Sequence, residues 1–255
     1  MNWLWINDLR IRTRISKTIS PLVASVEVIF RANKRALLTS SLVIASGVSV
    51  YASTPPAISF TDSFEGVTLY PYWSLATQNG TIGTSTNFAY SGSRSLRIAS
   101  RSGGDRSIVL KHNFGLLTKG VVSIAFYDAA PGEETLYEQF AVYNSKNPAV
   151  SAAVGTMDFD SECYMAGFGT DGPNALCGIY PQMSTAPVKR TAGWHVLTIS
   201  YGQTTVSISI DGKVVFVSTP GNYQFDTIQI SVSGPSWRPD TTAYFDNFQF
   251  TPLTY

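Results

Sequence analysis

The feature that most constrains the fold of this chain is a succession of short apolar runs, separated by Gly, Asn, Asp and Ser, that begins near residue 58. No part of this region keeps a helical period. About a dozen short strands in roughly 200 residues are typical of a two-sheet antiparallel sandwich of jelly-roll type. The sequence therefore predicts an all-β fold, with strands at 95–100, 107–114, 120–128, 138–144, 151–159, 163–169, 193–201, 205–212, 213–219, 226–234 and 243–250.

One predicted hairpin has a clear alternation of apolar and polar residues. Val206, Ile208 and Ile210 alternate with serines, so the apolar side chains should face the core. Asp211 and Gly212 follow, and an Asp-Gly pair supplies the positive φ angles that a tight turn needs. The sequence thus predicts a hairpin over 205–219.

The N-terminal region has the charge pattern of a targeting segment. Residues 1–52 hold seven of the 18 Lys and Arg but two of the 17 Asp and Glu, and an uncharged stretch of 17 residues, 36–52, ends in Val50-Tyr51-Ala52. This ending resembles a signal-peptidase site. An uncleaved membrane anchor is the competing interpretation, because the basic region is long; an organelle transit peptide fits poorly. Both of the first two interpretations place the body outside the cytoplasm, secreted or anchored at the cell surface.

These patterns divide the chain into a targeting or anchor segment (1–52), a linker (53–57) and a sandwich domain (58–255). Residues 53–255 carry 11 basic and 15 acidic side chains, which argues against nucleic acid as a partner. Contact with a membrane is expected only through an uncleaved N-terminal segment.

The chain has two cysteines, Cys163 and Cys177, both in the exported part. In an oxidising compartment such a pair is expected to form a disulfide that closes a short loop.

Four segments together resemble a concanavalin A-like, laminin-G-like jelly-roll domain: DSFEG with YW (62–66, 72–73), AYSGSRSLRI (89–98), RTAGWHVLTISY with VSISIDGKVV (190–215) and AYFDNFQF (243–250). The resemblance implies a module that binds glycans or proteins, or a passive module. It also implies a structural calcium ion between the first and last strands, with Glu65 and Asp246 as ligands. Two acids alone are weak evidence for calcium, which prefers several oxygen ligands, and ordinary solvated turn residues are the alternative.

Three carboxylates on alternate positions, Asp158, Asp160 and Glu162, raise the possibility of catalysis. They resemble the catalytic strand of laminarinase- and lichenase-like glycosidases, with His195 following at a similar spacing. The position of the nucleophile holds Asp158, however, where that family has Glu. The runs on either side of the acids have the pattern of paired strands, which puts residues 158–162 in a connecting loop. A hairpin turn is therefore favoured over a catalytic strand.

The residues expected to contact a ligand are aromatic side chains in loops and their neighbours. Trp237 and Arg238 lie in the Pro- and Ser-rich loop SGPSWRPDTT, and Tyr223 and Tyr164 are weaker candidates. Trp194 and Trp73 are expected in the core. The sequence predicts an exported, non-catalytic module that binds a glycan or an extracellular partner. A glycoside hydrolase or lyase that uses the acid triplet, and a structural component of an extracellular assembly, are the alternatives.

Overall fold

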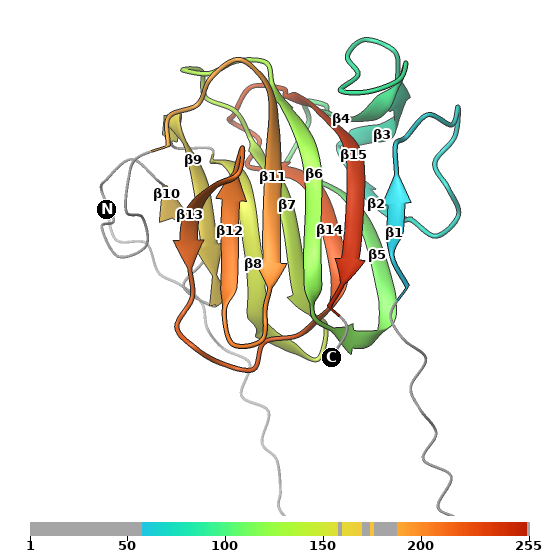
Figure 1. Ribbon diagram of the computed structural model, residues 1–255. Helices are drawn as coiled ribbons and strands as arrows, with labels where there is room; N and C mark the ends of the chain where they lie inside the picture. Colours follow the sequence, from blue (N-terminus) through green and yellow to red (C-terminus); the bar gives the residue numbers. More distant parts are fainter. Residues whose placement is uncertain (1–57, 158–159, 170–173, 176–187, 254–255) are drawn as a thin grey trace, which may run out of the picture. The chain divides into compact units, whose positions relative to one another are not determined.

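The computed structural model describes residues 58–157, 160–169, 174–175 and 188–253, which form two antiparallel sheets (Figure 1). The first sheet contains, in spatial order, β13 (Lys213–Val217), β12 (Val206–Ile210), β11 (Gly193–Tyr201), β6 (Gly120–Asp128), β15 (Thr242–Pro252), β4 (Ser95–Ser100) and β3 (Gly80–Ser85), with β1 (Phe60–Asp62) also paired to β15. The second contains β10 (Asn174–Ala175), β9 (Asp160–Phe168), β8 (Asn147–Met157), β7 (Tyr137–Asn144), β14 (Phe225–Gly234), β5 (Arg106–Thr118) and β2 (Ser74–Gln78). The predicted all-β, two-sheet sandwich is confirmed.

The core lies between the two sheets and is built from alternate residues of their central strands. In β12, Val206, Ile208 and Ile210 are buried, while the serines between them are partly exposed, as predicted. In β14 of the second sheet, Ile228 and Ile230 are fully buried and face the same core. Burying each such side chain stabilises the fold by about 1.5–3 kcal/mol. Within the described part of the chain, no helix has the length and apolar character needed to cross a membrane.

The predicted Asp-Gly hairpin joins β12 to β13. Asp211 and Gly212 have φ angles of 51° and 75°, the left-handed conformations that a two-residue turn of this hand requires. The Asp211 carboxylate also accepts a hydrogen bond from the Val196 amide, at 2.8 Å, which ties the turn to β11.

The expectation that Trp194 is a core anchor is wrong. His195, Leu197 and Ile199 of β11 are buried, so strand alternation turns Trp194 to the outer face of the first sheet. There Trp194 is half-buried, and its ring lies 5.3 Å from that of Tyr127. Trp73, by contrast, is buried as expected.

One end of the sandwich gathers three connections that are distant in sequence. The pairing of β4 and β6 with β15, and of β5 and β7 with β14, brings together the loops 101–105, 129–136 and 235–241. We call this the loop end. It contains the candidate site.

Candidate functional site

An exposed tryptophan stands on the β14–β15 loop at the loop end. Trp237 is 78% exposed, yet the chain on either side of it is fixed by Arg106, the first residue of β5. The buried guanidinium of Arg106 donates through Nη1 to the carbonyl oxygens of Pro235 (2.8 Å) and Arg238 (2.9 Å). The indole is therefore exposed to solvent on a loop whose backbone is fixed by hydrogen bonds.

Carboxylates complete the fastening of this loop. Asp240 accepts from Arg106 Nη2 at 2.7 Å and from the Ser102 amide at 3.2 Å. The amide of Ser236 donates to the Asp105 carboxylate at 3.1 Å. A side chain displayed on a pre-ordered loop loses less conformational entropy when a ligand contacts it. The loop is thus suited to binding.

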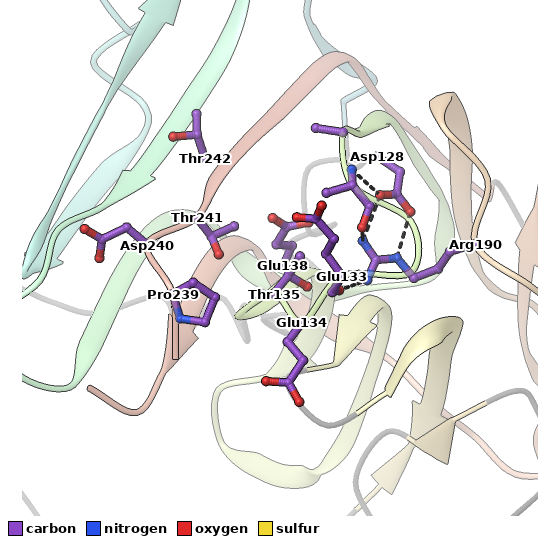
Figure 2. Close-up of a pocket in the computed structure, with 12 residues that line it drawn as sticks. Asp128, Glu133, Glu134, Thr135, Glu138, Arg190, Pro239, Asp240, Thr241 and Thr242 are labelled. Atoms are coloured by element: carbon purple, nitrogen blue, oxygen red, sulfur yellow. Dashed lines mark hydrogen bonds and ion pairs between the residues drawn. The ribbon is translucent and has the colours of Figure 1, made fainter. Parts of the chain in front are cut away.

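A pocket of about 160 Å³ lies next to this loop (Figure 2). Residues 128–130, 133–135, Glu138, Arg190 and 239–242 line it. Pockets that enclose a drug-sized ligand are about 300–1,000 Å³. This pocket is smaller, so it can hold one group or ring of a longer ligand.

A buried ion pair forms one wall of the pocket. Arg190 donates to both carboxylate oxygens of Asp128, at 2.8 and 2.9 Å, and neither side chain has exposed surface. The Tyr164 hydroxyl donates to the same carboxylate at 3.1 Å. The guanidinium also donates to three carbonyl oxygens, those of Ala130 (3.0 Å), Glu133 (3.1 Å) and Ser161 (3.4 Å). Because these bonds use its donors on every side, Arg190 fixes the wall and is not available to a ligand.

A second buried acid, Glu138 of β7, also lines the pocket and is 4% exposed. Burial raises the pKa of its carboxyl from 4.5 to about 8, and the negative charge of Asp128 adds to this shift, although Arg190 and Thr156 oppose it. At neutral pH, Glu138 is therefore mostly uncharged.

The predicted binding residues do not form one cluster. Arg238 follows Trp237 at the loop end and forms an ion pair with Glu134 at the rim of the pocket. Tyr164 is 1% exposed, so its proposed role as a surface contact is wrong: its ring belongs to the core, and its hydroxyl binds Asp128. Tyr223 precedes β14 and therefore lies away from the loop end, with its ring 4.7 Å from that of Phe168.

Two residues of the acid triplet, Asp160 and Glu162, lie in a strand and not in a connecting loop. Strands β8 and β9 pair as expected, but β9 already begins at Asp160, so the prediction of a loop is wrong for Asp160 and Glu162. The reason is additional pairing, since the Glu162 carbonyl oxygen accepts a hydrogen bond from the Arg190 amide at 2.7 Å. Asp158 lies outside the described residues.

Both ring nitrogens of His195 lie within hydrogen-bond distance of other residues of the domain. Its Nδ1 lies 2.7 Å from the Asp211 carboxylate and its Nε2 2.7 Å from the Thr191 carbonyl oxygen.

Cys163 is buried in β9, and Cys177 lies outside the described residues, so the disulfide stays a prediction.

The two expected calcium ligands approach the same loop, 90–94. Glu65 accepts hydrogen bonds from the Ser93 amide, at 3.0 and 3.1 Å, and Asp246 accepts one from the Tyr90 amide at 2.8 Å. Backbone N–H groups lower the pKa of Glu65, whereas burial raises that of Asp246. Within the described residues, no three acidic, His or Cys side chains form a group that could hold a metal. Calcium would therefore need carbonyl oxygens of the loop as further ligands.

Sequence analysis did not single out Arg106, Asp128, Glu138 or Arg190. One signal was present: Glu138 has the same alternation as Phe140 and Val142, so the pattern of β7 places a carboxyl on the inward face. A buried acid of this kind marks a candidate functional site. Asp128 meets Arg190, and Arg106 meets the Trp237 loop, only in the folded chain.

Comparisons with known proteins identify the fold. No protein-family model and no curated protein sequence matches this chain. The cellulose-induced protein Cip1 is 15% identical with a TM-score of 0.57, over 75% of this chain and 96% of that one. The Crh5 transglycosylase is 12% identical with a TM-score of 0.53, over 77% and 85%. The laminarinase catalytic domain of Thermotoga maritima MSB8 is 12% identical with a TM-score of 0.52, over 76% and 98%. This chain therefore has the concanavalin A-like sandwich fold that its sequence motifs predict.

Proposed function

We propose that this protein is an exported, non-catalytic sandwich module that binds a glycan through the Trp237 loop and the adjacent pocket. The observation that carries the proposal is the 78% exposure of Trp237 on a loop fastened by a buried arginine. An exposed aromatic side chain on an ordered loop can bind a sugar, because the apolar face of a sugar ring stacks on an aromatic ring. The similar structures include a laminarinase and a transglycosylase, which are named for their action on glycans, and this supports a glycan as the ligand.

Polar side chains that could bind sugar hydroxyls line the pocket close to Trp237 in sequence. Asp240, Thr241 and Thr242 line the pocket a few residues beyond Trp237, and Glu134 lines it from the β6–β7 loop. Carboxylates accept hydrogen bonds from sugar hydroxyls, and threonine hydroxyls both donate and accept. An aromatic face with such a polar rim can orient a sugar ring without any catalytic step.

Replacing Trp237 by Ala should weaken glycan binding at least tenfold, which corresponds to about 1.4 kcal/mol, because the stacking face is lost. Trp237→Tyr should retain most of the affinity. Isothermal titration with laminarin, cello-oligosaccharides and chitin oligosaccharides measures the effect. Tyr70→Ala is the matched control, since Tyr70 is 51% exposed on a different segment. Equal affinity of wild type and Trp237→Ala for every bound glycan would reject this site, and released oligosaccharides would reject the non-catalytic role.

We further propose that calcium binds between Glu65 and Asp246. Binding to the folded state alone would stabilise it by about 2.7 kcal/mol when calcium is at a hundredfold excess over Kd. For a domain of this size, the melting temperature should then rise by several degrees. Chelator should remove the rise, and Glu65→Gln should reduce it. A melting curve that is the same in millimolar calcium and in chelator would exclude a structural calcium ion.

A further inference from the structure

We propose that the pocket beside Trp237 accepts the ammonium group of an amino sugar, so that the glycan ligand contains glucosamine units with free amines. This inference rests on the proposed function and adds the chemical class of the ligand.

Acidic side chains outnumber basic ones around the pocket. Three of the four arginines at this end are already paired with an acid: Arg190 with Asp128, Arg106 with Asp240 and Arg238 with Glu134. The fourth, Arg101, is exposed and does not line the pocket. Glu133 and Glu138 also line the pocket, and neither forms an ion pair within the described part of the chain. Two carboxyl groups are thus left without a cation.

Glu138 is buried with almost no hydrogen bonding of its own. Within the described residues, its carboxyl group has one hydrogen-bond contact, with the Thr156 hydroxyl 3.4 Å from Oε2. That hydroxyl has one hydrogen, and the Leu136 carbonyl oxygen lies nearer to it, at 3.1 Å. Among the described residues no donor reaches Glu138 Oε1. Oε1 is therefore open to the pocket, where a donor of a ligand can reach it.

The unpaired group faces the pocket. Figure 2 shows the Glu133 and Glu138 carboxyl groups pointing toward the same side of the pocket, from the β6–β7 loop and from β7. Arg190 cannot turn to either group, because its donors are held by Asp128 and by carbonyl oxygens. Since the described part of the chain supplies no cation for these two carboxyls, a cationic ligand is a suitable partner for them.

A primary ammonium group meets these requirements. It is a compact cation with three donors, so it can pair with the Glu133 carboxylate and also favours the ionised form of Glu138, which is mostly protonated without such a cation. A neutral hydroxyl can donate one hydrogen bond but leaves the Glu133 charge without a cation. A uronic acid or a sulfated sugar would add a like charge beside Glu133 and Glu138, which is unfavourable in a partly desolvated site. The pocket therefore favours an amino sugar over neutral and acidic sugars.

The test compares three β-1,4-linked oligosaccharides of equal length, built from glucosamine, N-acetylglucosamine or glucose. Isothermal titration is done at about pH 6, where a primary amine is charged, and at roughly 0.15 M salt. The glucosamine oligomer should bind at least tenfold more tightly than the other two. Glu133→Gln and Glu138→Gln should each remove most of this preference while leaving the affinity for the neutral oligomers unchanged.

Controls separate the pocket from general attraction of a polycation. In calcium-free buffer, Glu65→Gln removes one exposed carboxylate elsewhere and should keep the full preference. A peptide with the same number of lysine ammonium groups should bind weakly; binding as tight as that of the glucosamine oligomer would overturn the choice of a sugar. If the three oligomers bind equally and Trp237→Ala weakens all of them, the ammonium inference is overturned and the glycan function stands. If none of them binds, nor any other glycan, the proposed function itself is rejected.

Discussion

Replacing Arg190 by Met is expected to destabilise the domain by about 3–5 kcal/mol, because the buried Asp128 carboxylate then loses its cation. The Tyr164 hydroxyl and the Ala130 amide, at 3.1 and 3.3 Å, would remain as its donors. They cannot replace two charge-assisted bonds. Urea unfolding measures the change, and the melting temperature should fall on the order of 10 °C.

An ion pair with one exposed partner gives the control. Arg238, whose side chain is 16% exposed, also pairs with an acid at the loop end, and that acid, Glu134, is 61% exposed. Exposed pairs contribute about 0–1 kcal/mol, so Arg238→Met should cost far less than Arg190→Met. Combining Arg190→Met with Asp128→Asn should recover part of the loss, because no charge is then left buried. Equal costs for Arg190→Met and Arg238→Met would show that the Asp128–Arg190 pair does not hold the loop end together.

The fold was predictable where the periodicity is strong. The runs 120–128 and 193–201 were predicted with the bounds that β6 and β11 have, because alternating apolar residues mark strands with one buried face. Strands β2 and β3 were not predicted. β2 is exposed along its whole length, and β3 is only partly buried, so neither carries a burial pattern. Backbone pairing with β5 and β4 makes them strands, and a single sequence does not show that pairing.

The candidate site was predictable only in part. Trp237 was identified because an aromatic residue in a Pro- and Ser-rich loop has no core to enter. The ion pair beside it joins Asp128 to Arg190, which are 62 positions apart, and no local pattern links them. Likewise, Arg106 donates hydrogen bonds to the Trp237 loop, which is more than a hundred positions away in the sequence. Contacts of this kind follow from sheet topology, so they become visible only when the strand order is known.

Replacing Glu138 by Gln should remove a pH dependence of stability that the wild-type protein shows. Burial raises the pKa of Glu138 from 4.5 to about 8, so between these values the folded state keeps a proton that the unfolded chain has lost. The free energy of unfolding must then fall as pH rises through this window and level off above it. At about 1.4 kcal/mol per pH unit, the total loss is several kcal/mol.

Glutamine is neutral at every pH and nearly the same shape, so Glu138→Gln should match the wild type near pH 4.5 and exceed its stability above pH 8. Urea unfolding of both proteins across this range gives the difference. Glu133→Gln is the matched control: its carboxyl lines the same pocket from an exposed loop position, so its effect should stay within about 0.5 kcal/mol. Parallel stability curves for wild type and Glu138→Gln would mean that the Glu138 carboxyl is solvated. In that case Glu138 could not be the buried carboxyl group on which an ammonium ligand would act.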